Sequence, residues 1–544
     1  MARRSVLDLL DDIASLGDAK LRFLPDKPDW RSPSELGRAA YRAGWWWRGI
    51  AEPGEAVAAV LTSSFDCLSV AYGAWLAGLR LVSLPHPARG VSAQEYVKNL
   101  KTMCALADAR ILVMDPAYRP LLPDTDLKVY GFDGYRRSIQ PTYNLPAGPY
   151  PGSFVQFSSG STSDPKGIVL SLGSLGKAIE ATVDALEPRE HEAGVSWLPL
   201  SHDMGFIGVC LAALGATAPP WNTRGTLTLI RPEAFLARPS IWLETCSEEK
   251  ATFTAAPGFA LELAARMLRH TRTALDLSSI RVISCGAEPI KANGLRHFAD
   301  AARPFGFDDI AFCPAYGLAE ATLGVTTIRP QERWRVERVD REALGEGVVE
   351  LSQGTAADDT YELVSCGSPF ANTDVRIAGA AAYGLIEVRS TSLMDGYLGK
   401  ESVPIGDDGW LTTGDLGFMD GHDLFVTGRA DDVIIMAGRN LYPDDIELVA
   451  SNHPLVRKGD CAAVKYDGGY AIVVEPVRPG VSEDSLIQAG REIRAELARV
   501  LQASPTRVVF VTRNTLAKTP SGKLKRSLIA CQLIDDELAV ESMV

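Results

Sequence analysis

The segment SSGSTSDPKG, residues 158–167, has the residue types that a nucleotide's phosphates require. Its glycines and small hydroxyl residues let a backbone turn tightly and aim N–H and O–H donors at one point, and its lysine adds a positive charge. It is not a Walker loop, because Pro165 precedes the lysine and Gly167 follows it. A phosphate loop is one interpretation, and a surface loop rich in serine and glycine is the other. The candidate phosphate-binding residues are Ser158, Ser159, Gly160, Ser161, Thr162 and Lys166.

Five further stretches gather carboxylates, an imidazole and an amine into short motifs that could bind ribose hydroxyls, a cation or an anion. They are WLPLSHDMG at 197–205, SCGAEP at 284–289, AYGLAEAT at 315–322, GWLTTGD at 409–415 with FVTGRADD at 425–432, and KTPSGKLKRS at 518–527. Each motif is weak alone. Six motifs in this order over about 370 residues form a pattern that chance rarely produces.

The size and charge of the chain narrow the possible functions. Its 544 residues exceed what one hydrophobic core normally supports, so two or more domains are expected. Apolar residues make up 46% and charged residues 23%, which is typical of a folded globular protein. The formal charge of -13 argues against a primary nucleic-acid binder, since affinity for a phosphate backbone needs clustered lysine and arginine.

Cysteine spacing and apolar runs indicate the compartment. The nine cysteines include no CxxC or CxxxC pair, so no zinc site or disulfide framework is expected. Aspartates at positions 8, 11 and 12 interrupt any apolar core of a signal peptide. The longest uncharged run, 204–223, contains three glycines and two prolines and predicts a buried helix, not a membrane span. We therefore expect a reduced, cytoplasmic protein without an integral membrane segment.

The elements that must position these motifs alternate between helix and strand. Residues 34–50 and 63–78 are helical in pattern, whereas 56–62, 79–84 and 109–115 are strand-like. This alternation predicts an α/β fold. Three further strand candidates, 195–201, 251–257 and 281–288, end at polar or glycine-containing loops, which is where open parallel sheets bind ligands.

Two changes of composition divide the rest of the chain. Residues 331–361 are charged and weakly periodic, which indicates an inserted or loosely packed element. The composition changes again at GRADD, and the residues that follow have the pattern of a compact α+β module. We therefore expect one domain over 1–430 and a second over 431–544, with the boundary near Asp431.

The six motifs, in their order and spacing, resemble the adenylate-forming superfamily, which includes acyl-CoA synthetases, luciferases and the adenylation domains of peptide synthetases. The resemblance covers nearly the whole chain. Within the superfamily the chain is most similar to the fatty acyl-AMP ligases, although Ala319 stands where many relatives carry threonine. The features that carry this likeness are HDMG at 202–205, CGAEP at 285–289, YGLAEAT at 316–322, the charged element after it, and AGRNLYPDDIE at 437–447.

The resemblance implies a fold and an activity. It implies a large amino-terminal domain of α/β layers with a small β-barrel part, and a small mobile α+β domain at the carboxyl end. The implied reaction activates a carboxylic acid with ATP and Mg²⁺ to an acyl-adenylate and pyrophosphate, and then transfers the acyl group to an acyl carrier protein. In the ligases an insertion like 331–361 is thought to restrain the second domain and to disfavour coenzyme A, and a plain surface loop is the alternative.

The same resemblance assigns roles to individual residues. Lys523 matches the catalytic lysine, and its alternative is a solvated basic tail. An amine delivered by domain closure would stabilise the negative charge that builds up when a carboxylate attacks a phosphate. Thr162 and His202 are the other two residues predicted to be catalytic. For His202, a purely structural role is the alternative interpretation. Glu320 matches the magnesium ligand and Asp431 the hinge. The remaining nucleotide-binding candidates are Gly286, Ala287, Glu288, Tyr316, Gly317, Asp415 and Arg429.

The acyl pocket departs from the pattern of long-chain ligases. Ala255 and Ala256 stand where such ligases usually have glycines, and the extra methyl groups would shorten or narrow the pocket. We therefore expect long saturated chains not to be the best substrates. His202 and Asp203 are expected near the acyl site, and Arg224 could bind a polar or acidic substrate group.

Three functions remain open from the sequence. The first is acid activation followed by transfer to a carrier-protein thiol. The second is a coenzyme A ligase, which shares the first half-reaction. The third, of another class, is a nucleotide-binding or acyl-binding protein without catalysis, which the presence of Lys523, Glu320 and Asp415 disfavours.

Overall fold

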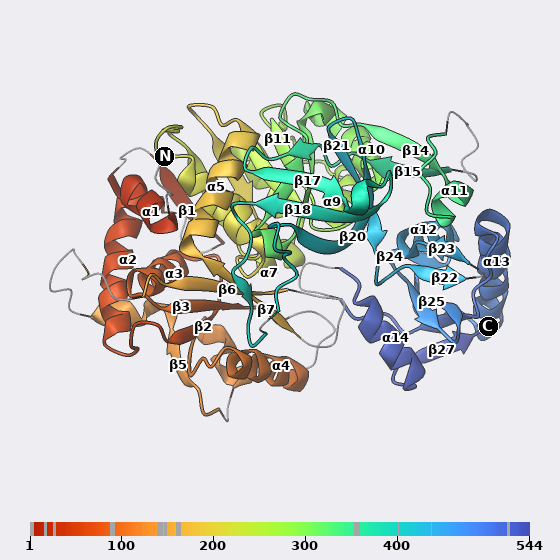
Figure 1. Ribbon diagram of the computed structural model, residues 1–544, viewed down its shortest axis with the longest axis horizontal. Coiled ribbons are helices and arrows are strands. Elements are labelled where there is room, and N and C mark those ends of the chain that lie inside the picture. Colours follow the sequence, from red (N-terminus) through yellow and green to blue (C-terminus); the bar gives the residue numbers. More distant parts are fainter. Residues whose placement is uncertain are drawn as a thin grey trace.

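The computed structural model describes residues 5–15, 19–25, 29–87, 93–122, 125–138, 145, 150–158, 165–352, 360–400, 402–436, 438–518 and 523–544. Two sheets of seven and eight strands, with helices packed around them, form most of the larger domain, and a smaller domain follows at the carboxyl end (Figure 1). The expected α/β fold with a large first domain and a small second one is therefore confirmed.

The seven-stranded sheet carries the ends of the predicted phosphate loop. Its strands, in order of pairing, are β19 (Gly396–Tyr397), β7 (Lys166–Ser171), β6 (Ser153–Ser158), β3 (Arg80–Leu84), β2 (Ala56–Val60), β4 (Ile111–Met114) and β5 (Lys128–Gly131). The strands from β6 to β5 run parallel to one another. β7 pairs antiparallel with β6, and β19 pairs antiparallel with β7. Their interiors are apolar on both faces, as expected for a parallel sheet covered by helices. The helices that accompany them are α2 (Pro33–Arg48), α3 (Phe65–Leu76), α4 (Ala93–Leu106) and α5 (Leu172–Leu186).

The eight-stranded sheet carries most of the other motifs. Its strands, in order of pairing, are β1 (Lys20–Leu24), β9 (Thr226–Ile230), β8 (Ala193–Ser196), β10 (Phe253–Ala256), β11 (Val282–Cys285), β12 (Phe312–Gly317), β13 (Gly324–Thr327) and β16 (Ser368–Pro369). The strands from β1 to β12 are parallel, so their carboxyl ends share one edge. The helices that connect them are α7 (Pro232–Ala237), α8 (Ser240–Glu248), α9 (Gly258–Leu268) and α10 (Ala292–Ala302).

The first part of the long uncharged run, 204–215, forms a buried helix, as predicted, whereas 216–223 are not helical. It begins as a π-helix, η3 (Met204–Leu211), and continues as α6 (Ala212–Gly215). Cys210 and Leu211 belong to the hydrophobic core between the two sheets. Among the described residues no helix is long and apolar enough to cross a membrane.

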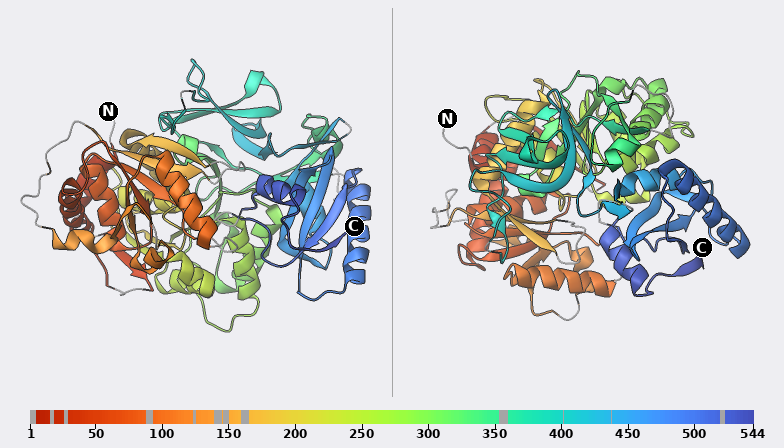
Figure 2. Two further views of the ribbon diagram at one scale, coloured as in Figure 1. Left: turned by 90° about the horizontal axis from the view of Figure 1, so that it is seen from below. Right: turned by 45° about the vertical axis from the view of Figure 1, so that its right-hand side comes forward.

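A smaller antiparallel sheet stands in place of the expected β-barrel. It consists of β17 (Thr373–Ile377), β18 (Gly384–Ser390), β20 (Leu411–Asp420) and β21 (Asp423–Arg429), and in the described residues it stays open between β17 and β21. Figure 2 shows it projecting above the larger sheets. Its last two strands carry two motifs, because Asp415 of β20 pairs directly with Arg429 of β21.

The charged element, which we call the insertion, forms a helix and two paired strands in its described part. β14 (Val336–Asp340) pairs antiparallel with β15 (Thr360–Val364), and α11 (Arg341–Gly345) follows β14 directly. Val339 and Leu344 are fully buried. The inserted element is therefore packed, and residues 353–359 lie outside the described part of the chain.

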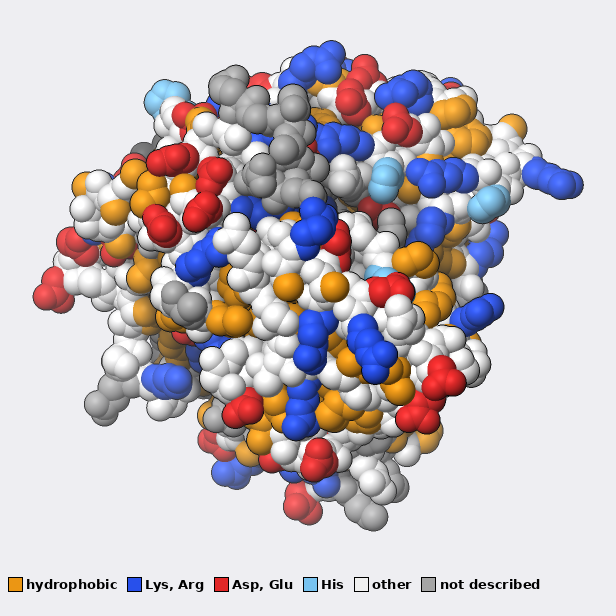
Figure 3. All heavy atoms as spheres, turned by 90° about the vertical axis from the view of Figure 1, so that its right-hand side faces the viewer, with side chains coloured by type: hydrophobic (Ala, Val, Ile, Leu, Met, Phe, Trp, Pro, Cys, Tyr) orange, Lys and Arg blue, Asp and Glu red, His pale blue; other side chains and the backbone are white. Residues whose placement is uncertain are grey.

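The smaller domain has its own sheet and core. β24 (Val456–Tyr466), β25 (Gly469–Pro476), β26 (Arg507–Val511) and β27 (Val540–Met543) pair in that order. One apolar cluster packs under α12 (Pro443–Ala450) and α13 (Glu483–Leu501), and a second packs under α14 (Arg526–Ile534). A short pair, β22 (Ile434–Met436) and β23 (Arg439–Leu441), leads into α12. Charged side chains of both signs cover the side of the molecule on which this domain lies (Figure 3).

Candidate active site

The predicted site residues of the larger domain meet at one edge of the eight-stranded sheet. His202 follows β8, Ala256 ends β10, Glu288 follows β11 and Tyr316 lies near the end of β12. Because the carboxyl ends of parallel strands lie together, these residues are brought to one edge of the sheet from different parts of the chain, and we call this edge the crevice. The structure therefore agrees with the expectation that the loops after these strands form the site.

Lys523 of the smaller domain reaches the same edge. Burial acts to raise the pKa of Asp203, but the His202 imidazole and the Lys523 ammonium outweigh it and hold that pKa below its ordinary value. Burial also raises the pKa of Glu288 and of Asp415, and the Lys523 charge counteracts both shifts. One amine thus acts on carboxylates from three separate elements. The catalytic role of Lys523 stays a prediction.

Asp415 is held from two sides. The Tyr316 hydroxyl donates a hydrogen bond to its Oδ2 at 2.7 Å, and Nε of Arg429 lies 3.3 Å from its Oδ1. Burial raises the pKa of Asp415, while Arg429 and the hydroxyl lower it. Tyr316 thus joins the site through its hydroxyl and does not merely pack in the core.

The Glu320 carboxylate has a partner that the sequence did not indicate. Glu320 lies in a short turn, η6 (Ala319–Ala321), and the hydroxyl of Tyr397 donates to its Oε1 at 2.9 Å. Its Oε2 accepts no hydrogen bond from the described residues. No group of three metal-binding side chains occurs in the described part of the chain. A single carboxylate with one unengaged oxygen fits a Mg²⁺ ion that takes its other ligands from phosphate oxygens and water.

His202 is oriented by its neighbour. Its Nδ1 lies 2.7 Å from Oδ1 of Asp203, and the backbone N–H of Met204 donates to the same carboxylate oxygen at 2.6 Å. The pair stands at the start of η3, and π-helical turns often occur at functional sites. The contacts fix the imidazole at the crevice, and they are equally compatible with a structural histidine.

The loop after β11 is shaped by backbone constraints. Ala287 has a φ of +68°, in the left-handed region that non-glycine residues rarely adopt. Such conformations cost about 1–3 kcal/mol and persist mainly at functional sites. A Cβ on Gly317 would lie 2.1 Å from the Leu323 carbonyl oxygen, so only glycine fits there. Glu288 accepts the N–H of Phe259 at 2.7 Å, which caps the start of α9.

The phosphate loop is bounded but only partly described. Ser158 at the end of β6 pairs with Lys166 at the start of β7, so the two strands bring the loop's ends together. Ser159, Gly160, Ser161 and Thr162 lie outside the described residues, as does the side chain of Ser158. Their assigned roles stay predictions.

The structure describes the predicted substrate residues. Ala255 and Ala256 are fully buried at the carboxyl end of β10, and their place in the acyl pocket stays a prediction. Arg224 is not brought to the site. Its side chain is 60% exposed, its Nε lies 4.0 Å from Oε1 of Glu190, and it precedes β9 at the amino edge of the sheet. We therefore no longer assign it to the substrate.

A buried ion pair joins the insertion to the smaller domain. Arg341 of α11 contacts Asp445 of α12 through two hydrogen bonds of 2.9 Å, from Nε to Oδ2 and from Nη2 to Oδ1. Their side chains are only 13% and 10% exposed. We call this pair the latch. It is surrounded by an apolar cluster that includes Leu344 and Tyr361 of the insertion and Tyr442 before α12.

A second cluster supports the loop that carries the lysine. Arg526, three residues after Lys523, donates to Oδ1 of Asp444 at 2.8 Å and to both oxygens of Glu447 at 2.8 and 2.9 Å. It also lies 3.5 Å from Asp432, next to the predicted hinge. Sequence reasoning missed Arg526, Arg341 and Tyr397, because each acts through a partner that is distant in sequence. The only available signal was the basic run around Lys523.

The predicted hinge residue, Asp431, lies in a turn directly after β21 and is exposed. Its carbonyl accepts a hydrogen bond from Nζ of Lys465 at 2.6 Å. The place suits a pivot, and its movement stays a prediction.

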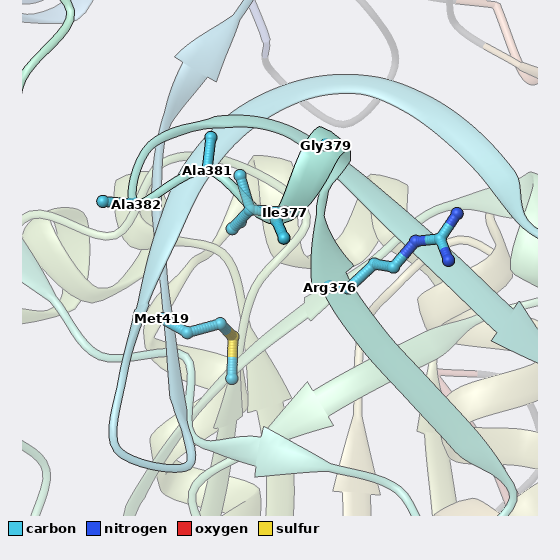
Figure 4. Close-up of a pocket in the computed structure, with 7 residues that line it drawn as sticks. Arg376, Ile377, Gly379, Ala381, Ala382 and Met419 are labelled. Carbon is cyan, nitrogen blue, oxygen red and sulfur yellow. The ribbon is translucent and has the colours of Figure 1, made fainter.

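A surface hollow elsewhere on the molecule contains none of the motif residues. Figure 4 shows it at the turn between β17 and β18, where Ile377, Gly379 and Ala381 face Met419 of β20. It offers one guanidinium, Arg376, which already pairs with Glu387 and Asp408. This hollow therefore supports no chemistry, and the candidate site is the edge described above.

The chain is similar to known proteins along most of its length. The model of the family of AMP-binding enzymes matches residues 19–398. The medium-chain-fatty-acid–[acyl-carrier-protein] ligase JamA of Moorena producens is 32% identical over 414 residues, which cover 71% of this chain and 68% of JamA. A 4-hydroxyphenylalkanoate adenylyltransferase of Mycobacterium marinum is 32% identical over 535 residues, covering 89% of this chain and 82% of that protein. A solved chain from a study of fatty acyl-adenylate ligases of E. coli and L. pneumophila superposes with a TM-score of 0.88 at 27% identity, covering 98% of each chain.

Proposed function

Because this chain belongs to the family of AMP-binding enzymes and is an acid-activating ligase, we propose that it forms an acyl-adenylate and passes the acyl group to the phosphopantetheine thiol of a carrier protein. In the first step a carboxylate oxygen attacks the α-phosphate of ATP, and pyrophosphate leaves. In the second step the thiol attacks the acyl carbonyl, and AMP leaves with the electron pair of the broken bond. The observation that carries the proposal is the convergence of Lys523 on the crevice that holds Asp203, Glu288 and Asp415.

Lys523 has the central role in the first step. Two anions must approach one another, and a preorganised amine in a partly buried crevice stabilises the charge that accumulates between them. The amine belongs to the smaller domain, so it can be withdrawn when that domain rotates. We place the domain boundary after residue 430 and the pivot at Asp431, in line with its exposed position after β21.

The nucleotide would lie across the edge of the sheet. Asp415 is the acceptor for the ribose hydroxyls, and Arg429 adds a charge-assisted contact. Tyr316 and Gly317, with Gly286, Ala287 and Glu288, would border the adenine. Because the Tyr316 hydroxyl already donates to Asp415, a bound ribose shares or displaces that hydrogen bond.

The phosphates would be held by the serine-rich loop, with Thr162 and Lys166 as its donors. Glu320 is the residue that would hold Mg²⁺. When bound, the ion would offset the negative charge of the phosphate oxygens. The protein's own part is to fix the Glu320 carboxylate, which Tyr397 does through its hydroxyl.

The latch favours a carrier protein over coenzyme A as the acceptor. An insertion bonded to the smaller domain through Arg341 and Asp445 restrains the rotation that a coenzyme A ligase needs. The relative JamA is named for transfer to an acyl carrier protein, which supports the same choice. Transfer to coenzyme A is the alternative, because it shares the first half-reaction and the same site residues.

The acid is a compact or aromatic one in this proposal. Ala255 and Ala256 fill the end of β10 with methyl groups, in a wall that is fully buried. In a close-packed wall, a loss of volume as small as one methylene group changes which acids fit. The relative from Mycobacterium marinum is named for 4-hydroxyphenylalkanoates, which carry an aromatic ring. His202 and Asp203 would lie beside its carboxylate.

The compartment that we propose is the cytoplasm. All nine cysteines are free thiols, and eight of them are buried. Burial raises the pKa of Cys67 to about 12, so this thiol is inert at neutral pH. Such thiols suit a reducing environment.

One experiment tests the proposal. Pyrophosphate release is measured over short, medium, long and aromatic acids, with the wild type and with Lys523→Ala, and the acyl group is then offered to a carrier protein or to coenzyme A. We expect acid-dependent release that Lys523→Ala lowers by about a hundredfold or more, in line with the loss of a preorganised electrostatic group. A protein that releases no pyrophosphate with any acid would instead be a silent binding protein. A sixteen-carbon acid as the best substrate would refute the pocket argument alone.

A further inference from the structure

A short segment, Leu393–Leu398, connects the strand after the phosphate loop with the turn that carries Glu320. We call it the strap. On one side, the backbone N–H of Asp395 donates to the Val169 carbonyl at 2.8 Å, and that of Leu398 donates to the Gly167 carbonyl at 2.7 Å. On the other side, the N–H of Met394 donates to the Glu320 carbonyl at 2.8 Å. The strap therefore holds the two elements at a fixed separation.

The contact with the phosphate-loop strand is close. A Cβ on Gly167 would lie 2.5 Å from Cδ1 of Leu398, so the missing side chain at this glycine lets Leu398 of the strap pack directly on β7. Gly167 directly follows Lys166, the lysine of the predicted loop. Any displacement of the strap would therefore move the strand that begins with this lysine.

Tyr397 is the strap residue whose side chain faces the site. Its hydroxyl donates to Oε1 of Glu320 at 2.9 Å, and its backbone lies in β19 opposite Ile168 of β7. The phenol is the donor in this hydrogen bond, because an ionised carboxylate oxygen can only accept.

A phenol that donates a hydrogen bond to one carboxylate oxygen fixes the direction in which the other oxygen points. The side chain of a glutamate has several accessible rotamers, and a hydrogen bond to Oε1 selects the subset in which Glu320 points toward Tyr397. Partners of metal ligands act in this way, because they orient the ligand before the ion arrives. The strap gives Tyr397 a fixed position relative to both the turn and the phosphate-loop strand.

We propose that Tyr397 is a positioning residue that fixes the Glu320 carboxylate for the divalent cation accompanying ATP, and that the strap sets the distance between this carboxylate and strand β7. The inference rests on the proposed role of Glu320 as the cation ligand. Tyr397 touches neither substrate nor reacting atoms in this account, and it acts only through Glu320.

The test removes one oxygen atom. Tyr397→Phe keeps the ring and its packing, including the contact with Lys400, whose Nζ lies 5.8 Å from the ring centre. Tyr135→Phe is the matched control, because Tyr135 also donates to a carboxylate at 2.9 Å, that of Asp66, in a region remote from the site. Thermal unfolding of both variants establishes that they are folded.

The first measurement is cation binding without turnover. The dissociation constant of Mn²⁺ is determined by electron paramagnetic resonance in the presence of a non-hydrolysable ATP analogue. We expect Tyr397→Phe to raise it about tenfold, the lower end of the effect of removing a partner of a metal ligand, because the phosphates supply the other ligands. Tyr135→Phe should leave it unchanged.

The second measurement separates positioning from a general structural role. We expect Tyr397→Phe to raise the Mg²⁺ concentration for half-maximal pyrophosphate release by a similar factor, while kcat at saturating Mg²⁺ and the KM for the acid stay within about twofold. An unchanged Mn²⁺ dissociation constant, or a fall of kcat that excess Mg²⁺ does not restore, would overturn the inference. If the wild type itself releases no pyrophosphate with any acid, the proposed function fails instead.

Discussion

The latch between Arg341 and Asp445 gives the sharpest test of the choice of acceptor. Both side chains are nearly buried, at 13% and 10% exposure, and their two hydrogen bonds measure 2.9 Å each. Removing one partner of a buried ion pair typically costs about 3–5 kcal/mol, because the other charge is left without compensation. Burial already raises the pKa of Asp445, and Arg341 is the group that counteracts this.

Loss of the latch destabilises only one arrangement of the two domains. Arg341 belongs to the insertion and Asp445 to the smaller domain, so the pair exists only while the domains keep the arrangement in which Lys523 faces the crevice. If Arg341→Met destabilises that arrangement by about 3 kcal/mol, its population relative to rotated arrangements falls about a hundredfold. The rotated arrangements should then be more populated than in the wild type.

The assay compares two acceptors. With Arg341→Met we expect formation of the coenzyme A thioester to rise at least about tenfold, while pyrophosphate release falls by a smaller factor, because some molecules leave the arrangement that activates the acid. Spin labels on the two domains should report a broader distribution of distances. Arg389→Met serves as the control, since Arg389 forms an exposed pair with Asp374 at 2.9 Å that spans no domain interface. A broader distance distribution without any gain in coenzyme A transfer would refute the reasoning.

Two further predictions concern the site itself. Arg526→Met should lower pyrophosphate release by about a hundredfold, because Lys523 loses the anchor that Asp444 and Glu447 provide. A hundredfold loss is the typical effect of a small misplacement of a catalytic group. Acyl transfer from a supplied acyl-adenylate should change much less, and equal losses in both half-reactions would contradict this. Asp415→Asn should abolish ATP binding yet raise the midpoint of thermal unfolding at pH 7. Burial raises the pKa of Asp415 in the folded state, so its stabilising contribution is present below the ordinary value and is lost as pH rises through the raised pKa. The gain in midpoint should disappear in acid, below the ordinary pKa of an aspartate.

Much of the crevice could be predicted from the sequence because of one property of parallel sheets. Residues that follow successive strands meet at one edge, so recognising the strands before His202 and Glu288 was enough to bring their loops together. The same property explains the error over Arg224. Closeness in sequence to the substrate wall suggested a contact, but a residue that precedes a parallel strand lies at the opposite edge.

The missed residues share a different property. Tyr397 and Glu320 are 77 positions apart, and Arg341 and Asp445 are 104 positions apart. Such pairs depend on how separate elements pack, and neither periodicity nor a short motif encodes that packing. The charge of residues 331–361 indicated an insertion, but only the structure identifies which arginine reaches the smaller domain.

Helix α12 connects the latch with the loop of Lys523. Asp444 and Glu447 are three positions apart, so they lie on one face of the helix and both bind Arg526. Asp445 is turned about 100° from Asp444 and binds Arg341 of the insertion instead. One face of α12 therefore binds Arg341, which restrains domain rotation. Another face binds Arg526, which supports the loop of Lys523. Because both contacts need the same position of α12, loss of the latch should weaken the support of Lys523, and the effects of Arg341→Met and Arg526→Met on pyrophosphate release should be less than additive.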